Sequence, residues 1–396
     1  MAFSKVLLIF LLVSLVFGPE AYGTGATTKG LGLEKGTQTP SSNPVKTFKT
    51  NDGDTIDCFQ IYSQPSLQHA SLKDHVVQMQ PTSYPNSGTN STNSSSGQSL
   101  QWNKGGEHCP EWSVPVSRNV NHSLEHVAPL SATQSATSGL DSVGMTGKFH
   151  HEFALLKTDY PPDYGFFGAS ARINVWNPLT REKEFSSASI TLLAGTEYIS
   201  AGWIVYKQLF GDSSTRLFTF WKGTDRQCYN YSPDCPGFVH VNHQVGLGVK
   251  IQPLSIPDGQ QYGIDVMIFK DTKTHDWWFR FQGKDVGYWP SSLFTSLSSW
   301  ATSVQYGGEI TDEKFEGFHT TTRMGSGDFA GWGYGKAAYI SNIAYVNGDN
   351  DIKTPQHYRP VITDSGCYSL DISDRGNLGL HIFFGGPGNS AEKCPH

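Results

Sequence analysis

From Phe149 onward, the chain consists of short runs rich in β-branched and aromatic residues, each bounded by Gly, Pro, Asn or Asp. Runs of this composition form β-strands, and the bounding residues form turns. The runs predicted as strands are 171–178, 187–195, 198–206, 216–223, 236–242, 244–254, 262–271, 276–283, 284–290, 336–348, 367–373 and 378–388. Residues 293–301 are a candidate short helix, but 42 Gly and 21 Pro argue against long helices. The pattern predicts a mainly β fold, a sandwich of antiparallel sheets.

The N-terminus has the pattern of a secretory signal peptide. Lys5 precedes an apolar run over residues 6–17, and Ala21-Tyr22-Gly23 supplies a small-x-small cleavage site. The apolar run is short for a membrane span, and no comparable stretch follows it. We therefore predict a signal peptide over residues 1–23 and a secreted protein with no membrane anchor. A buried N-terminal helix is the alternative.

The six cysteines fit an oxidising compartment, in which disulfides form. They are Cys58, Cys109, Cys228, Cys235, Cys367 and Cys394. Pairing between sequence neighbours would give Cys58–Cys109, Cys228–Cys235 and Cys367–Cys394, but many other connectivities are open and the sequence does not select one. A zinc site is the competing interpretation. Because no C-x-x-C pair is present and the spacings do not repeat, disulfides are favoured.

Charge and sequons narrow the predicted partners. The formal net charge is −6, and no run of Lys or Arg forms a basic stripe, so nucleic acid is not a predicted partner. Asn-x-Ser/Thr sequons occur at Asn90, Asn93, Asn121 and Asn230, which are candidate glycosylation sites in a secreted chain. The sequence does not fix an oligomeric state.

The N-terminal part of the chain differs from the strand-rich part. Residues 45–59 predict two short strands around an Asn-Asp-Gly turn, and residues 65–80 are the best helix candidate, with partial 3.6-residue periodicity. These elements predict a small α+β domain that ends near Arg118. The predicted organisation is a signal peptide (1–23), a flexible leader (24–44), the α+β domain (45–118), a polar linker (119–142) and the β-sandwich domain (143–396).

Segments at collinear positions carry a family pattern. VKTFKTNDGDTIDC (45–58) and CPEWSVPVSR (109–118) bracket the α+β domain, and AGW, YGGEI, GYGKAAYISNI and FFGGPG follow along the strand-rich part. Together they resemble the neprosin family, plant glutamic endopeptidases with an activation peptide. The resemblance covers nearly all of the chain after the leader and implies that the α+β domain is a propeptide, removed by cleavage in the linker. Trp112, Ser113 and a single Arg118 replace the family's usual Gly-Thr and Arg pair.

The resemblance implies a peptidase site in which two glutamates face each other across a cleft between sheets. One carboxylate accepts a proton from the attacking water and the other donates one, because two close carboxylates cannot both ionise easily. In this chain the first position is Ser200, within TEYISAGW, and the second is Glu309, within YGGEI. A serine hydroxyl cannot act as a general base at ordinary pH, and no G-x-S-x-G elbow surrounds Ser200. One of the two reactive carboxylates is therefore missing.

Glu197 lies three residues before Ser200 and could in principle replace the missing carboxylate. Side chains alternate along a strand, so Glu197 is expected on the opposite face; a β-bulge that shifts the phase is the alternative. For Glu309, the resemblance favours an active-site acid. The alternative is a charged residue at a strand end, beside a turn formed by Gly307-Gly308.

The remaining polar and aromatic candidates receive structural interpretations. Asp225 and Asp265 are interpreted as solvated charges. Five tryptophans could line a groove for proline or sugar rings, but packing is favoured: Trp203, Trp221, Trp277, Trp278 and Trp289. No metal and no other cofactor is predicted, because no further ligand stands at metal spacing from either histidine pair: His150-His151 and His240/His243.

The implied function is a secreted, propeptide-controlled endopeptidase that cleaves proline-containing peptides. Ser200 favours an alternative, a catalytically silent extracellular β-sandwich that binds peptide or glycan in the former active-site cleft. A third hypothesis, a sugar-binding protein, rests on the Trp-rich strands alone. A second carboxylate within one water's reach of Glu309 would favour the first of these functions.

Overall fold

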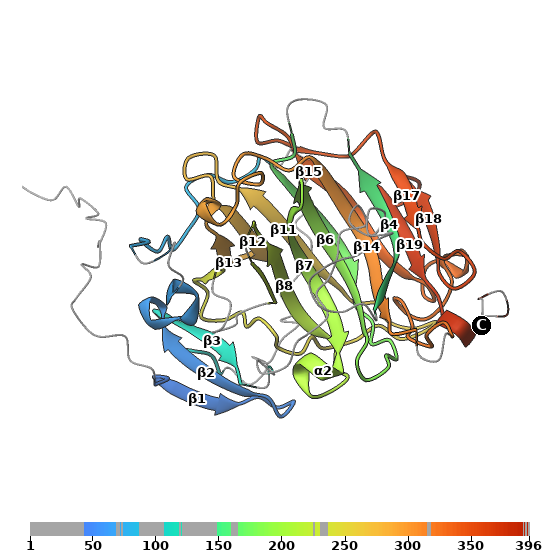
Figure 1. Cartoon of the computed structure of the whole chain (residues 1–396), viewed down its shortest axis with the longest axis horizontal. Coiled ribbons are helices and arrows are strands. Elements are labelled where there is room, and N and C mark those ends of the chain that lie inside the picture. Colours follow the sequence, from blue (N-terminus) through green and yellow to red (C-terminus); the bar gives the residue numbers. More distant parts are fainter. Residues whose placement is uncertain are drawn as a thin grey trace, which may run out of the picture. The chain divides into compact units, whose positions relative to one another are not determined.

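The computed structural model describes residues 43–68, 72, 74–86, 107–118, 120, 149–159, 165–224, 226–229, 237–314, 318–390, 392 and 394. They belong to one compact unit. Two antiparallel sheets form a sandwich (Figure 1), which confirms the predicted fold class. Within these ranges, no helix has the length and apolar character needed to cross a membrane. The predicted signal peptide, the four sequons, Cys235 and Asp225 lie outside the described residues.

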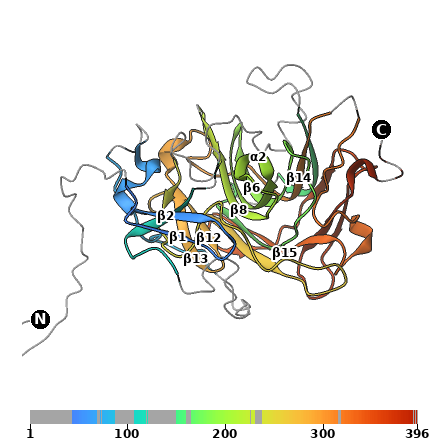
Figure 2. The ribbon, with the colours of Figure 1, turned by 90° about the horizontal axis from the view of Figure 1, so that it is seen from below.

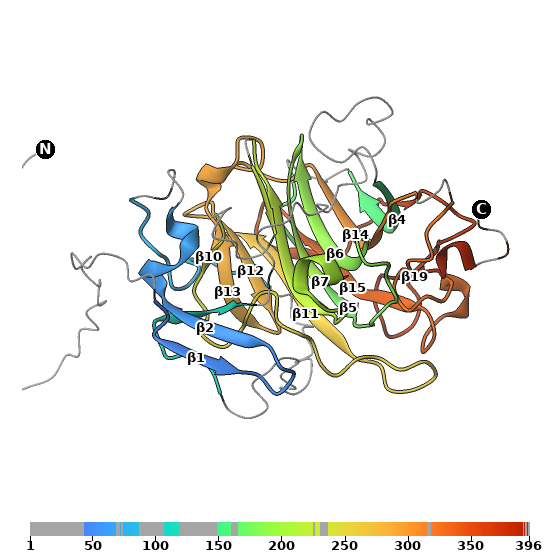
Figure 3. The ribbon, with the colours of Figure 1, turned by 60° about the horizontal axis from the view of Figure 1, so that its bottom comes forward.

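One sheet has seven strands in the order β17-β4-β14-β6-β7-β8-β9. Their bounds are β4 (His150–Thr158), β6 (Phe185–Ala194), β7 (Glu197–Tyr206), β8 (Arg216–Lys222), β9 (Gln227–Tyr229), β14 (Ser303–Asp312) and β17 (Arg359–Ile362). One face of this sheet packs against the second sheet (Figure 3). The opposite face, here called the outer face, carries Phe185, Tyr198 and Phe220 in a separate hydrophobic cluster.

The second sheet has nine strands, with β10-β13-β12-β11-β5-β15-β19-β18 in order and β16 paired to β15. Their bounds are β5 (Gly168–Asn174), β10 (Val239–His240), β11 (Gly263–Lys270), β12 (Trp277–Phe281), β13 (Lys284–Trp289), β15 (Ala338–Val346), β16 (Ile352–Lys353), β18 (Ser369–Ser373) and β19 (His381–Gly385). Each predicted run except 244–254 overlaps a strand, whereas β4, β9, β14, β16 and β17 lie outside the predicted runs.

The five tryptophans named above are buried in the core between the sheets, so packing is their role and the groove alternative is wrong. Two of them also satisfy their indole N–H inside the core. Trp203 Nε1 donates to the Asn174 carbonyl and Trp277 Nε1 donates to the Leu297 carbonyl, both at 2.8 Å. Indoles buried with a satisfied N–H add both packing area and a fixed orientation to the core.

The N-terminal module is a three-stranded sheet of β1 (Lys46–Lys49), β2 (Thr55–Gln60) and β3 (Ser113–Ser117). The predicted Asn-Asp-Gly turn joins β1 to β2, with Gly53 at φ +89°. The module lies against the sandwich beside β13 (Figure 2). Its apolar side chains join the main core: Ile61, Leu72, Val77 and Val114.

The helix predicted over 65–80 is not formed in the described residues. A 3-10 helix, η2 (Pro65–Gln68), opens this segment, and residues 75–80 are not helical. Leu72 and Val76 would share one helix face, yet Leu72 is buried and Val76 is 77 % exposed. The chain instead runs along the sandwich and donates side-chain hydrogen bonds to it, as from Gln78 to Asp276 at 2.8 Å.

Helices are few elsewhere in the described chain. The α-helix α2 spans Lys207–Phe210, and the remaining 3-10 helices are η1 (Ile61–Ser63), η5 (Ser291–Leu293), η7 (Ala330–Trp332) and η8 (Gly388–Ser390). The helix predicted over 293–301 is replaced by the end of η5 and turns. Glu197 accepts hydrogen bonds from the backbone N–H groups of residues 295–297, which holds them in a turn. Residues 244–254 form only isolated bridges.

Two of the three pairings between sequence neighbours are formed. Cys58–Cys109 closes the N-terminal module, and Cys367–Cys394 ties the residue before the β18 hairpin to the C-terminal segment. Cys228 is also disulfide-bonded, but its predicted partner lies outside the described residues.

Gly308 provides the first testable prediction. A Cβ at Gly308 would lie 2.6 Å from Phe384 Cε2 and 2.8 Å from Met324 Cγ, so the second sheet packs directly on this glycine. We expect Gly308→Ala to lower the free energy of unfolding by about 1–3 kcal/mol, measured by urea titration. Gly331→Ala is the matched control, because a Cβ there meets open space, and it should change stability by less than about 0.5 kcal/mol. Equal effects of the two substitutions would contradict this account of the packing.

Candidate functional site

Both positions singled out by the sequence lie on one sheet. Ser200 is in β7 and Glu309 is in β14, with β6 between them. Ser200 pairs with Thr191 and Glu309 pairs with Ser187 across the two ladders. Directly opposite residues share a face, so all four side chains belong to the outer face. The expectation of a site between two sheets is therefore wrong, because both positions lie on one sheet, on strands separated by β6.

The register separates the two positions along the strands. Thr191, opposite Ser200, faces Gln305 of β14, four residues before Glu309. On a flat sheet this offset puts the Ser200 and Glu309 Cα atoms roughly 17 Å apart. Only inward curvature of the sheet together with long side chains would bring functional groups at these positions together. A serine is too short to take part across that span.

Ser200 is engaged locally. Its side chain is buried, and its Oγ lies 2.9 Å from the Thr191 hydroxyl. A nucleophilic serine needs an adjacent base, commonly an imidazole that a third group orients. Another hydroxyl cannot remove the Ser200 proton. The contact therefore favours a structural role for Ser200 on the outer face.

Glu309 is paired with a histidine that sequence reasoning did not connect with it. His151 Nδ1 lies 2.7 Å from Glu309 Oε1, and the side chains are 8 % and 9 % exposed. His151 is in β4, the strand on the other side of β14, where it pairs with Thr311. The two are diagonal neighbours on one face, which no spacing in the sequence indicates because 158 residues separate them. A buried carboxylate with an imidazole can hold a proton between them.

Glu309 also lies in the middle of β14, not beside a turn. Gly307 and Gly308 continue the strand, with regular pairing to both β4 and β6. A Cβ at Gly307 would lie 2.3 Å from the Leu155 Cβ. These glycines therefore permit close packing of a neighbouring side chain and of the second sheet beside the acid.

The aromatic side chains of the outer face surround this pair. The outer-face cluster comprises Phe185, Leu193, Tyr198, Ile204, Tyr206, Leu209, Phe210, Phe218, Phe220 and Tyr229. Tyr198 stacks on Phe220 with ring centroids 5.6 Å apart. Burial raises the pKa of Tyr198 well above 10, and the negative charge of Glu309 raises it further. The Tyr198 hydroxyl consequently stays protonated and remains a hydrogen-bond donor at any working pH.

Two partly buried residues pack against the outer-face cluster: Val120, just after β3, and Phe149, just before β4. The Glu309 side chain is buried as well, 7 % exposed.

Glu197 does not replace the missing carboxylate. It is buried and accepts hydrogen bonds from the backbone of residues 295–297 and from the Thr224 hydroxyl. These donors fix the carboxylate on the face opposite Ser200, so the predicted strand phase is confirmed and the bulge alternative is wrong. Asp265 is an ion-pair partner of Arg172 at 2.9 Å, on the exposed side of the second sheet.

The other candidate histidines lie apart from Glu309, in different surroundings. Burial lowers the pKa of His240 to about 3, so its imidazole is neutral in the core. His243 lies beside the ring of His108, with centroids 5.6 Å apart. His150, next to His151, is exposed at the start of β4.

Solved structures and family models both match this chain. The fold is similar to a crystal structure of scytalido-glutamic peptidase with a peptide-based transition-state analog, at 11 % identity and a TM-score of 0.35, covering 60 % of this chain and 98 % of that chain. It is also similar to SCP-B, a member of the Eqolisin family, in complex with the tripeptide Ala-Ile-His, at 11 % identity and a TM-score of 0.34, covering 60 % and 98 %. The Neprosin activation peptide model matches residues 47–157, and the Neprosin model matches residues 182–387. Because this second match spans just over half of the 396 residues, the chain belongs to the neprosin family.

Proposed function

We propose that this protein is a secreted member of the neprosin family that binds proline-containing peptides on the outer face without hydrolysing them by the two-glutamate mechanism. The proposal rests on the contacts made by the side chains at the two positions where the family has its glutamates. Ser200 is hydrogen-bonded to Thr191, and Glu309 is paired with His151. One carboxylate with a histidine partner does not supply the matched acid and base that the two-glutamate reaction needs.

The surroundings of Glu309 support a peptide ligand. Proline rings pack well on aromatic faces, and Tyr198, Phe220 and Tyr229 provide such faces beside the acid. The Glu309 carboxylate adds a polar, charged group beside these aromatic faces. This combination suits an extended peptide better than a flat apolar ligand.

The packing of Val120 on the outer face supports control of peptide binding by the N-terminal module. Val120 follows the module directly and packs on the outer-face cluster. Removal of the chain around Val120, by cleavage in the predicted linker, would uncover the part of the outer-face cluster that Val120 packs against. We therefore propose that peptide binding requires release of this segment.

A second candidate function is hydrolysis by Glu309 and His151. The 2.7 Å contact supports it, since a carboxylate-oriented imidazole is a general base found in other hydrolases. In that case the second ring nitrogen of His151 would activate a water molecule, and Ser200 would have no catalytic role.

The test compares binding with turnover on a fluorescent proline-rich peptide, using acid-treated protein. We expect saturable binding and no cleavage by the wild type, and weaker binding by Glu309→Gln because the negative charge and one acceptor oxygen are lost. Glu182→Gln, which changes an exposed carboxylate, should bind like the wild type. Wild-type cleavage that Glu309→Gln abolishes would contradict the proposal. Loss of that cleavage also in His151→Asn would then establish the second candidate.

A further inference from the structure

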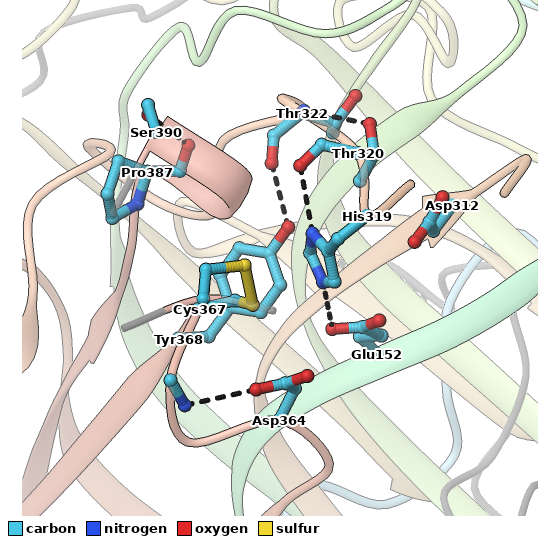
Figure 4. Close-up of a disulfide and its surroundings, with 12 residues drawn as sticks. Glu152, Asp312, His319, Thr320, Thr322, Asp364, Cys367, Tyr368, Pro387 and Ser390 are labelled. Atoms are coloured by element: carbon cyan, nitrogen blue, oxygen red, sulfur yellow. Dashed lines mark hydrogen bonds and ion pairs between the residues drawn. A yellow bond between two sulfur atoms is a disulfide. The ribbon is translucent and has the colours of Figure 1, made fainter. Parts of the chain in front are cut away.

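Three ionisable side chains converge on the inner side of the seven-stranded sheet, away from the outer face. Glu152 comes from β4, Asp312 is the last residue of β14, and His319 follows in a connecting segment (Figure 4). One ligand atom of each lies within 4.8 Å of the others, and all three residues are more than nine-tenths buried. The set joins residues far apart in the sequence, so no motif spacing indicates it.

The orientation of His319 leaves one ring nitrogen directed at this set. Its Nδ1 lies 2.9 Å from the Thr320 carbonyl oxygen, which can only accept, so Nδ1 carries a proton. Its Nε2 lies 3.0 Å from Glu152 Oε2. A bare Nε2 lone pair against a carboxylate would be repulsive. A proton between the two atoms, or a cation that both of them bind, removes this repulsion.

Lys314 supplies a cation to the same place. Its Nζ lies 2.9 Å from Asp312 Oδ2 and 3.7 Å from Glu152 Oε1. The Asp312 side chain is fully buried, and this ion pair places a cation directly on its Oδ2. The Lys314 side chain is 35 % exposed, so its ammonium has a route into solvent.

The segment that carries His319 is braced from two sides. The hydroxyls of Thr320 and Thr322 both donate to Glu184 Oε2. Tyr368 Oη donates to the Thr322 carbonyl at 2.8 Å, beside the Cys367–Cys394 disulfide. These contacts fix the Thr320 carbonyl and thereby the His319 ring. Such support of a histidine through its second nitrogen is what metal sites use to orient their ligands.

We propose that Glu152, Asp312 and His319 form a zinc site, and that Lys314 is the cation that occupies it when zinc is absent. One imidazole and two carboxylates suit Zn²⁺, whereas Ca²⁺ and Mg²⁺ prefer oxygen ligands alone. Tetrahedral zinc needs ligand atoms roughly 3.4 Å apart, so the set must contract by small side-chain rotations. A water molecule would complete the coordination.

The charges balance in both states. Without zinc, the two carboxylates are neutralised by Lys314 and by a protonated His319. With zinc, the ion replaces both positive charges, because His319 releases its Nε2 proton and the Lys314 ammonium moves into solvent. Zinc binding therefore releases one proton and requires no oxidant, reductant or further ligand from the protein.

A zinc ion here would clamp β4, β14 and the segment of His319 together. His151 precedes Glu152 in β4 and points to the outer face, where it contacts Glu309. Zinc on the inner face would therefore also fix the strand that holds the Glu309 partner. This inference concerns a separate site and does not depend on the proposed peptide binding.

The test measures zinc chloride binding to the EDTA-treated full chain by calorimetry, together with the melting temperature. We expect a high-affinity zinc event that raises the Tm. Lys314→Met should tighten zinc binding about tenfold or more, because the competing cation is gone, while lowering the Tm of the metal-free protein. His319→Asn should weaken the tight event by about 100-fold or more.

Matched controls separate this site from exposed histidines and lysines. His357→Asn and Lys353→Met alter exposed residues and should leave the tight event unchanged. If His319→Asn does not fold, Lys314→Met keeps all three ligands and still tests the proposal. Zinc affinity that Lys314→Met leaves unchanged, or a lower Tm in Lys314→Met that zinc does not restore, would overturn it in favour of a plain buried ion-pair cluster.

Discussion

Ser200→Glu is expected to give the protein a peptidase activity about 10²–10⁴-fold above the wild-type background, the usual contribution of a positioned acid–base group. The substitution restores the second carboxylate on the same face as Glu309. Where curvature of the sheet brings these two long side chains together, they share a proton, so one acts as base while the other acts as acid. The measurement is the rate of cleavage of a proline-rich peptide at acidic pH, after removal of the covering segment.

Two controls make this result specific. Ser200→Gln has the same side-chain length without the charge and should remain as inactive as the wild type. Combining Ser200→Glu with Glu309→Gln should return the rate to background, because the new carboxylate then lacks its partner. A folded but inactive Ser200→Glu would contradict the two-carboxylate explanation, and so would equal rates for the glutamate and glutamine variants.

The sequence predicts the strands that are rich in β-branched and aromatic residues, and it misses strands that glycine or proline interrupts. β8 is a nearly continuous run of β-formers and β7 has them at both ends, so the pattern predicts both strands. β14 was missed because Gly307 and Gly308 interrupt its pattern; the glycines are there to admit Leu155 and Phe384. β17 contains Pro360, which an edge strand tolerates and a sequence pattern penalises.

The sequence indicates only some residues of the candidate site, because the others are brought together by long-range strand pairing. Ser200 and Glu309 were identified by resemblance to a family, and strand alternation placed Glu197 correctly. The pairing of Glu309 with His151 depends on β4 lying beside β14, a long-range ladder that local pattern does not specify. The same ladder brings Glu152 next to Asp312, and because neither β4 nor β14 is predicted by its pattern, the sequence indicates neither arrangement.

Asp54→Asn is expected to destabilise the protein by about 3–5 kcal/mol, because it leaves a buried guanidinium without its main counter-charge. Arg216 in β8 is 0 % exposed and makes two bonds to Asp54, at 2.7 and 3.0 Å. Asp54 lies in the turn between β1 and β2, so this pair fastens the N-terminal module to the sandwich. The free energy of unfolding in urea and hydrogen exchange of β1 and β2 are the measurements.

The matched control is Asp265→Asn, which removes an exposed partner of Arg172 and should cost less than about 1 kcal/mol. Replacing both partners, Asp54→Leu with Arg216→Met, should recover much of the stability, since no charge is left buried alone. A cost for Asp54→Asn no larger than that for Asp265→Asn would show that the buried pair does not hold the module.

Acid should also weaken the contact between the N-terminal module and the sandwich, over a defined range of pH. Burial raises the pKa of Asp212, but hydrogen bonds from Arg216 outweigh this and lower it to about 2, from an ordinary value of 3.8. Because the folded-state pKa lies below the unfolded one, this stabilisation is complete above about pH 4 and is lost as the pH falls through about 2. Asp212→Asn should therefore reduce the slope of unfolding free energy against pH between these limits. An unchanged slope would mean that Asp212 does not contribute to the pH dependence of the junction.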